Sequence, residues 1–301
     1  MERKKVEIIE VGPRDGFQNV SSFIPTEIKL ETIDRLINAG LKNIQITSFV
    51  SPKAIPQMKD AEKVTKKCLE KYPHSKLFAL VPNLFGAKAA VECGLTELTY
   101  VISVSETHNR KNVKRTHHES FNELEEILNI FPEIKINLDV ATTFGCPYEG
   151  EFSIETIMTF LERAYNIGIR SFNLCDTVGL AYPSLIRTVV TNVLAKYSDC
   201  EIQIHIHDTR NMGIVNSLTA VECGINKIQT ALGGLGGCPF APGASGNTST
   251  EDFVYMLNKM GYNTGIDSEL VLNAAKYLKE NVEGNYSGHH IFIDKNKVST
   301  Q

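Results

Sequence analysis

The stretch IQIHIHD, residues 202–208, reads as a buried strand that ends in polar side chains. Side chains on a strand alternate between its two faces, so His205 and His207 share one face and the intervening isoleucines lie on the other. Asp208 follows directly and faces away from the pair. The pattern predicts two imidazoles side by side at the carboxyl end of one strand.

Similar β-rich runs alternate with amphipathic helical segments along the rest of the chain. The predicted strands are 6–12, 43–49, 76–82, 97–105, 135–144, 171–177, 202–209 and 227–233. The predicted helices are 26–39, 56–72, 84–93, 118–130, 153–167, 183–197, 210–223 and 250–260. Eight consecutive β-then-α units over about 260 residues are typical of a (β/α)8 TIM barrel, whose active site lies at the carboxyl ends of the strands.

A doubly wound open sheet is the alternative α/β fold. Such sheets usually have fewer strands, and no GxGxxG turn follows the first predicted strand. We therefore expect a single catalytic barrel domain over residues 1–301. Within it, residues 262–301 form a C-terminal extension with an additional helix near 267–282. No linker or low-complexity segment divides the chain.

The composition is ordinary for a soluble globular protein, with 42% apolar and 22% charged residues among 301. The net charge of −4 comes from 31 basic and 35 acidic residues spread along the chain, which argues against nucleic-acid binding. No apolar run reaches the roughly 20 residues of a membrane helix, and no signal peptide is recognised. The seven cysteines form no CxxC pair, so we expect reduced thiols and a cytoplasmic protein.

The first predicted strand ends in GPRDGFQN, residues 12–19. Arg14 supplies a fixed cation that can hold a carboxylate, a thioester oxygen or an enolate. Asp15 supplies a hard oxygen ligand or a base. The structural alternative is an Arg–Asp ion pair in a turn.

Two histidines in strand register at the mouth of a barrel suit a divalent metal. Imidazole and carboxylate ligands without a thiolate are compatible with Mg²⁺, Mn²⁺ or Zn²⁺. The last predicted strand leads into a glycine-rich segment, residues 232–247, which indicates unusual backbone angles and the close approach of a ligand. In this segment we expect Cys238 to be a reactive thiol, and the amide oxygen of Asn247 can reach the metal.

Two further polar residues end predicted strands. Ser48 ends the second strand, and Asp176 ends the sixth, where it is either a substrate contact or a helix N-cap. His108, His117 and His118 lie in a polar loop and a helix start, and we interpret them as solvent-exposed side chains rather than as ligands.

Several motifs together resemble the 3-hydroxy-3-methylglutaryl-CoA lyase family, a branch of metal-dependent (β/α)8 lyases. The resemblance extends from about Val6 to Gly265, and the glycine–cysteine segment is its most specific part. The motifs are VGPRDGFQN, TSFVSPKAIPQM, GCPYEG, HIHDT and GLGGCPFAPGASGN.

The resemblance implies three groups of site residues and a divalent ion, with Mg²⁺ or Mn²⁺ expected. The metal ligands are Asp15, His205, His207 and Asn247; the catalytic residues are Arg14, Asp15, His205 and Cys238; Arg14 and Asp176 bind the substrate. From their places on the second predicted strand, we also expect Gln45 and Ser48 to bind the substrate.

The implied reaction is retro-Claisen cleavage of 3-hydroxy-3-methylglutaryl-CoA to acetyl-CoA and acetoacetate, a step of leucine degradation. Either Asp15 or His205 takes the hydroxyl proton, and Cys238 protonates the enolate carbon or belongs to a closing loop. The implied partners are an acyl-CoA substrate and a second copy of the chain in a homodimer, without nucleic acid or membrane.

The sequence departs from the family at Gln45, where these lyases usually carry glutamate. The amide keeps a hydrogen-bonding group of similar size but removes a carboxylate. The substrate can therefore be a related 3-hydroxyacyl-CoA such as citramalyl-CoA. A Claisen-type synthase or aldolase and a non-catalytic CoA-binding descendant are also compatible with these residues. Condensing relatives usually carry a further C-terminal domain, for which the residues after Gly265 are too few.

Overall fold

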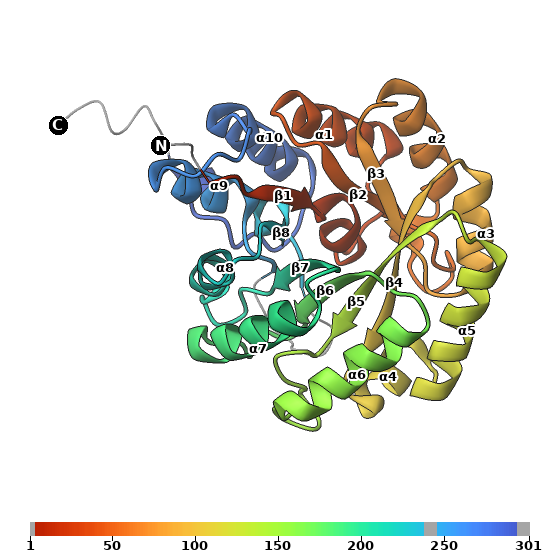
Figure 1. Cartoon of the computed structure of the whole chain (residues 1–301). Coiled ribbons are helices and arrows are strands. Elements are labelled where there is room, and N and C mark those ends of the chain that lie inside the picture. The colour runs from red at the N-terminus through yellow and green to blue at the C-terminus, as the bar shows by residue number, and fades with distance from the viewer. Residues whose placement is uncertain (1–3, 238–245, 294–301) are drawn as a thin grey trace.

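A computed structural model describes residues 4–237 and 246–293 of the chain, and its centre is a closed barrel of eight parallel strands (Figure 1). Each strand pairs with its neighbours in sequence, and β8 pairs with β1 to close the ring. The predicted (β/α)8 barrel is therefore confirmed. The strands are β1 Glu7–Glu10, β2 Asn43–Ser48, β3 Lys76–Leu80, β4 Glu97–Ser103, β5 Lys135–Ala141, β6 Ser171–Asp176, β7 Glu201–Ile206 and β8 Lys227–Thr230.

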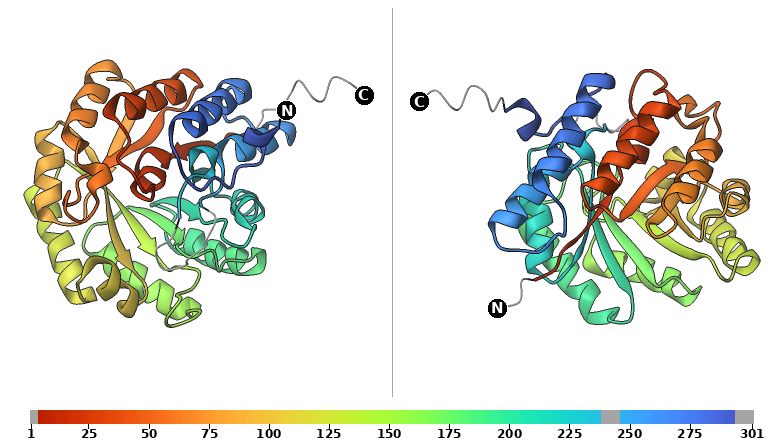
Figure 2. Two further views of the ribbon diagram at one scale, coloured as in Figure 1. Left: turned by 180° about the vertical axis from the view of Figure 1, so that it is seen from behind. Right: turned by 90° about the horizontal axis from the view of Figure 1, so that it is seen from above.

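Helices cover the outside of the barrel, as both views in Figure 2 show. Among the described residues, no helix combines the length and the apolar composition that crossing a bilayer requires. The helices are α1 Thr26–Asn38, α2 Ala61–Lys71, α3 Leu84–Glu92, α4 Glu106–Val113, α5 His117–Ile130, α6 Ile154–Asn166, α7 Pro183–Lys196, α8 Gly213–Glu222, α9 Thr250–Lys259 and α10 Ser268–Asn281.

Two helices differ from the sequence prediction. Pro56–Met58 form a separate 3₁₀ turn, so α2 begins at Ala61 rather than at residue 56. The sequence pattern does not predict α4, because the segment ETHNRKNV has no continuous apolar stripe. This helix is capped at Ser105, whose side chain accepts a hydrogen bond from the backbone N–H of His108.

The main apolar core lies between the barrel and its helices. On β7, Ile204 and Ile206 are fully buried in this outer layer. The alternate residue Gln203 points into the barrel, where it accepts a hydrogen bond from Gln229 and donates one to Asn137 of β5, a strand that is not its neighbour. The alternation read from residues 202–208 thus places polar side chains inside the barrel and isoleucines outside.

Glu10 links the closing strands to the loop after β8 and to the start of α9. Its Oε1 accepts hydrogen bonds from the backbone N–H groups of Gly12 (2.7 Å) and Leu232 (2.8 Å), and its Oε2 accepts one from Thr250 Oγ1 (2.7 Å). Burial raises the pKa of the Glu10 carboxyl to about 7, although these hydrogen bonds favour its charged form.

The chain after α10 returns to the barrel and contacts both ends of the glycine-rich segment. α10, the expected additional helix, packs against α1. Beyond it, the backbone N–H of Gly288 donates to Gly233 O (3.0 Å). The Ser287 hydroxyl contacts the carbonyl oxygens of Gly234 (3.2 Å) and Asn247 (3.1 Å). The C-terminal residues therefore help to fix Asn247, although they lie far from it in sequence.

Replacing Glu10 by Gln tests this buried carboxyl. Because the pKa is higher in the folded state than in the unfolded chain, this group's contribution to wild-type stability falls as pH rises from about 4.5 to about 7. The neutral amide lacks this dependence. We expect the unfolding free energy of Glu10→Gln minus that of the wild type to increase by about 2 kcal/mol as pH rises from about 5 to about 8. Urea denaturation at each pH measures both free energies. A difference in unfolding free energy between the two proteins that stays constant over this pH range would contradict the prediction.

Candidate active site

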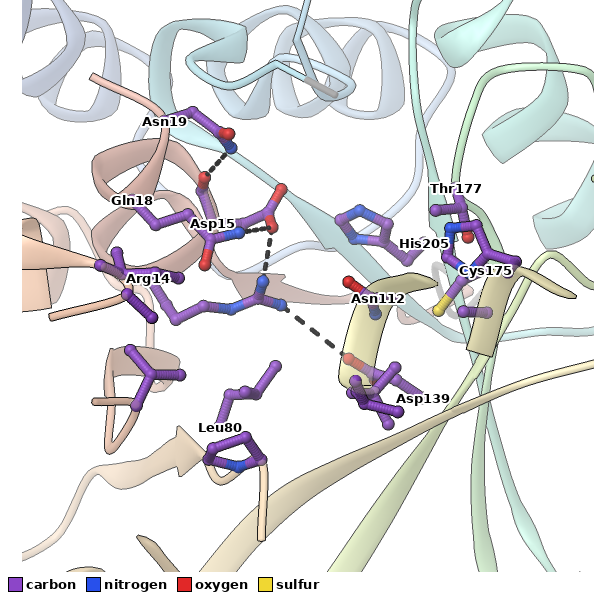
Figure 3. A pocket seen from close by; sticks show the side chains of 18 of the residues that line it. Arg14, Asp15, Gln18, Asn19, Leu80, Asn112, Asp139, Cys175, Thr177 and His205 are labelled. Atoms are coloured by element: carbon purple, nitrogen blue, oxygen red, sulfur yellow. Dashed lines mark hydrogen bonds and ion pairs between the residues drawn. The ribbon is translucent and has the colours of Figure 1, made fainter. Parts of the chain in front are cut away.

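A cavity of about 580 Å³ opens at the carboxyl end of the barrel (Figure 3). Its wall contains residues from all eight strands or from the segments that follow them, which is where a (β/α)8 barrel places its chemistry. The polar residues of the wall that matter here are Arg14, Asp15, Asp139, Cys175, His205 and His207.

Asp15, His205 and His207 form a buried cluster in this wall. One ligand atom from each residue lies within 4.8 Å of those from the other two. Asp15 Oδ2 is 3.9 Å from His207 Nε2, and the two imidazole centroids are 5.0 Å apart. The cluster joins a residue near the start of the chain to β7 because β1, β8 and β7 are consecutive in the closed sheet.

Arg14 and Asp15 lie in a turn of π-helix, Gly12–Gly16, directly after β1. Such wide turns are uncommon and often occur at functional sites. The turn approaches the loop after β8 closely, since a Cβ atom on Gly12 would lie 3.1 Å from Leu232 N and 2.6 Å from a Glu10 carboxylate oxygen. Glycine at position 12 therefore allows the turn to present both functional side chains to the cavity.

Asn247 lies beside this cluster. Its backbone forms an isolated antiparallel bridge with His207, and its Nδ2 donates to Asp15 Oδ2 at 2.8 Å. Its Oδ1 is buried and receives no hydrogen bond from the described residues. The structure thus brings together all four residues expected as metal ligands.

The electrostatics of the cluster favour the protonation states that bind a cation. Burial opposes ionisation of Asp15, but Arg14 and the two imidazoles outweigh it and lower the pKa of Asp15 to about 2. Burial, followed by the neighbouring His207, lowers the pKa of His205 to about 3. Burial likewise lowers the pKa of His207. At neutral pH the cluster contains one carboxylate and two neutral imidazoles.

The hydrogen bonding of these residues fits a bound divalent ion. Nδ1 of His205, Nδ1 of His207 and Oδ1 of Asn247 are buried without a hydrogen-bond partner among the described residues. Such unpaired polar atoms are costly unless a ligand or a solvent molecule satisfies them. A donor set of one carboxylate, two imidazoles and one amide oxygen suits Mg²⁺, Mn²⁺ or Zn²⁺. The residues present can therefore hold the ion.

Arg14 is held on three sides by residues from different parts of the barrel. Its Nε donates to Gln45 Oε1, and its Nη1 donates to Asp15 Oδ1 at 2.5 Å. Its Nη2 is 3.9 Å from Asp139 Oδ2, as the dashed line in Figure 3 marks. Gln45 itself donates to Thr99 Oγ1 at 2.9 Å and is fully buried. The amide thus lies behind Arg14 and outside the cavity wall.

Two other expected substrate contacts, Ser48 and Asp176, also lie outside the cavity wall. Ser48 is buried, and its hydroxyl contacts Leu80 O at 3.1 Å. Asp176 accepts hydrogen bonds from the backbone N–H groups of Leu180 (2.8 Å) and Ala181 (3.2 Å). Burial raises the pKa of Asp176 to about 7 despite these bonds. Asp176 therefore caps the backbone of the loop after β6, a role similar to the helix N-cap that the sequence offered as the alternative. Cys238 lies outside the described residues.

The interpretation of His108 as a solvent-exposed residue was wrong. His108 is only 1% exposed and lines the cavity, and its Nδ1 is 2.7 Å from Ser103 Oγ. His117 is half-buried, with its Nε2 2.8 Å from Ser103 O. His118 is exposed, as expected. The helix α4, which the apolar pattern does not predict, turns His108 inward.

Asp139 is a wall residue that the sequence analysis missed. It lies on β5 and accepts a hydrogen bond from Asn173 Nδ2 of β6 at 2.8 Å. Burial raises the pKa of Asp139 to about 6, although Arg14 opposes this shift. A signal was available, because Asn137 and Asp139 alternate with apolar residues in 136–140, which places an acid on the inward face close to the end of a strand.

Comparison with known proteins places this geometry in a family. The sequence model of the HMGL-like family matches residues 5–278. The chain belongs to the HMGL-like family. Within that family, it is 43% identical over 279 residues to the hydroxymethylglutaryl-CoA lyase of Bacillus subtilis (strain 168), an alignment that spans 92% of this chain and 93% of its relative.

Solved structures of HMGL-like lyases have the same fold. The crystal structure of the Bacillus subtilis HMG-CoA lyase superposes with a TM-score of 0.91 at 41% identity, covering 97% of this chain and 98% of that one. An HMG-CoA lyase from Acinetobacter baumannii, solved with coenzyme A and 3-methylmalate, has a TM-score of 0.89 at 37% identity, covering 99% and 95%.

The burial of His108 yields a direct spectroscopic prediction. Burial lowers the pKa of its imidazole to about 4, although Glu149 opposes the shift. We therefore expect the ring nitrogens of His108, assigned with His108→Gln, to keep their neutral-form chemical shifts as pH falls from about 8 to about 5. Nitrogen-15 NMR measures this titration. A midpoint near the ordinary histidine value would show that the side chain is exposed.

Proposed function

We propose that this protein cleaves 3-hydroxy-3-methylglutaryl-CoA to acetyl-CoA and acetoacetate in a metal-dependent retro-Claisen reaction. The observation that carries the proposal is the Asp15–His205–His207 cluster, with Arg14 beside it, in one wall of the cavity. Membership of the HMGL-like family supports the same reaction. The Acinetobacter relative was solved with coenzyme A, which supports an acyl-CoA substrate.

Asp15, His205, His207 and Asn247 would hold the divalent ion, with Mg²⁺ or Mn²⁺ expected. When bound, the ion would act as a Lewis acid that makes the substrate hydroxyl more acidic. Arg14 lines the same cavity and forms an ion pair with Asp15. Its guanidinium would therefore contact another oxygen of the same substrate.

Arg14 would bind the thioester oxygen of the substrate. Its guanidinium lies in the wall of the cavity and is only 6% exposed, so an oxygen that contacts it is largely shielded from water. Negative charge grows on this oxygen when the carbon–carbon bond breaks, because the bonding electron pair passes into the thioester enolate. A fixed cation in a site of low dielectric stabilises that charge.

Two proton transfers complete the reaction. Asp15 or His205 would take the proton of the tertiary hydroxyl, whose oxygen becomes the ketone oxygen of acetoacetate. The enolate carbon must then receive a proton to give the methyl group of acetyl-CoA. Cys238 is our proposed donor at this step.

A related substrate such as citramalyl-CoA is the second candidate. Its carboxylate is bonded directly to the hydroxylated carbon, and the observation that favours a changed substrate is Gln45 behind Arg14, where these lyases usually carry glutamate. Citramalyl-CoA would be cleaved by the same bond changes, with pyruvate as the second product. A panel of thioesters therefore separates the two candidates.

The assay mixes purified protein, Mg²⁺ or Mn²⁺ and each thioester in turn, and measures acetyl-CoA release. We expect 3-hydroxy-3-methylglutaryl-CoA to be cleaved with the highest kcat/KM, and a chelator to abolish the activity. Arg14→Lys should lower kcat about 100-fold, because lysine cannot present the planar fork of donors. Absence of cleavage with every 3-hydroxyacyl-CoA tested would refute the proposed function.

Metal binding can be measured without turnover by titrating Mn²⁺ into the metal-free protein in a calorimeter. We expect one site per chain, and His207→Ala should weaken binding by more than about tenfold, since it removes one ligand. His118→Ala is the matched control, because His118 is exposed and outside the cavity. Equal affinities for the two variants would exclude His207 from the site.

Three wider expectations remain predictions. They are a cytoplasmic location with a role in leucine degradation, a homodimer, and a single catalytic domain over residues 1–301. Sedimentation velocity on the purified full chain decides the oligomeric state.

A further inference from the structure

We propose that Asp139 is a positioning residue for Arg14, and that it supplies the charged partner that the neutral Gln45 does not. The inference rests on the proposed function, in which Arg14 contacts the thioester oxygen. It concerns a residue on β5, which lies across the barrel from the turn that carries Arg14. Asp139 would act through Arg14 and would not itself exchange a proton with the substrate.

Three residues surround the guanidinium of Arg14. Nε is bound by the amide oxygen of Gln45, Nη1 by a carboxylate oxygen of Asp15, and Nη2 lies near Asp139. With only the first two partners, the guanidinium plane can still tilt about the line that joins Nε and Nη1. A partner at Nη2, which lies off this line, fixes the plane.

Asp15 pairs with Arg14 and is also a ligand of the proposed metal site. Its Oδ1 accepts from Arg14 and from Gln18 Nε2 (3.0 Å), and its Oδ2 accepts from Asn247 and lies in the proposed metal site. An ion bound there would share the negative charge of Asp15. Among the described residues, Asp139 is the other carboxylate that forms an ion pair with Arg14. It can therefore balance the arginine when Asp15 binds the ion.

The distance between Asp139 and Arg14 suits a residue that orients the guanidinium without occupying its N–H groups. At 3.9 Å, Oδ2 is within ion-pair range of Nη2 but beyond a direct hydrogen bond. The N–H groups of Nη2 therefore stay available to a ligand oxygen while the carboxylate orients them by charge. Asn173 holds the other carboxylate oxygen at 2.8 Å, so the position of Asp139 is itself fixed by β6.

The test is an exchange of the carboxylate between the two strands, using Asp139→Asn, Gln45→Glu and the double variant. Asn is isosteric and can still accept from Asn173, so only the charge is lost. We expect Asp139→Asn to lower kcat about tenfold or more with a smaller change in KM, because Arg14 acts mainly on the transition state. The double variant should recover most of that loss, as coupled neighbours do in a double-mutant cycle.

Asp60→Asn is the matched control. Asp60 pairs with Lys29 at 2.6 Å, and both side chains are buried to about the same degree as those of Asp139 and Arg14. This pair lies outside the cavity wall. We expect the control to lower the unfolding temperature while leaving kcat within about twofold of wild type.

A second readout is independent of turnover. Nitrogen-15 NMR of arginine-labelled protein, assigned with Arg14→Lys, reports rotation of the guanidinium about the Nε–Cζ bond. We expect separate Nη signals in the wild type, merged signals in Asp139→Asn and separate signals again in the double variant. Should Asp139→Asn not fold, the double variant alone decides, because it has as many carboxylates as the wild type.

The inference is overturned if Asp139→Asn keeps the wild-type kcat, or if the double variant is no more active than Asp139→Asn. The latter result would mean that Asp139 contacts the substrate itself. If the wild type cleaves no thioester in the panel, the proposed function fails, and the NMR signals still show whether Asp139 fixes Arg14.

Discussion

The site depends on the pairing of β1 with β8, which closes the barrel. Asp15 follows β1, and His205 ends β7, with about 190 residues of chain between them. Only closure brings the two strands to the same arc of the wall, with β8 alone between them. The buried carboxyl of Glu10 stabilises this closure by binding Gly12 and Leu232, which lie at the bases of the two loops that carry the site. A weaker closure would therefore disturb the active site together with the fold.

Charge balance is the second constraint on the cavity. Arg14, Asp15 and Asp139 are each less than 8% exposed, and burying an unpaired charge at such positions is costly. The structure meets this cost by placing the arginine between two carboxylates and by keeping both imidazoles neutral. The same arrangement leaves one carboxylate and two neutral imidazoles beside a fixed cation. Stability and the proposed chemistry thus use the same interactions, which limits the substitutions that this wall can accept.

Much of this architecture could be predicted from the sequence because it depends on local pattern. The alternation in residues 202–208 placed His205 and His207 on one face, and eight β-then-α units indicated the closed barrel. Residues whose position depends on the partners they meet in space were not predictable in this way. Asp139 becomes part of the site because the barrel brings β5 near Arg14, and Asp176 turns away because two backbone N–H groups bind it. His108 is buried by a helix whose start is set by a single serine cap.

We infer that barrel closure creates one divalent-cation site from Asp15, His205 and His207. The most direct measurement is a crystal structure of the protein grown with Mn²⁺, with data collected at the manganese absorption edge. We expect an anomalous peak within bonding distance of the Asp15 carboxylate and of one nitrogen from each of the two imidazoles. A manganese peak elsewhere in the protein, with both imidazoles bonded only to protein groups, would contradict it.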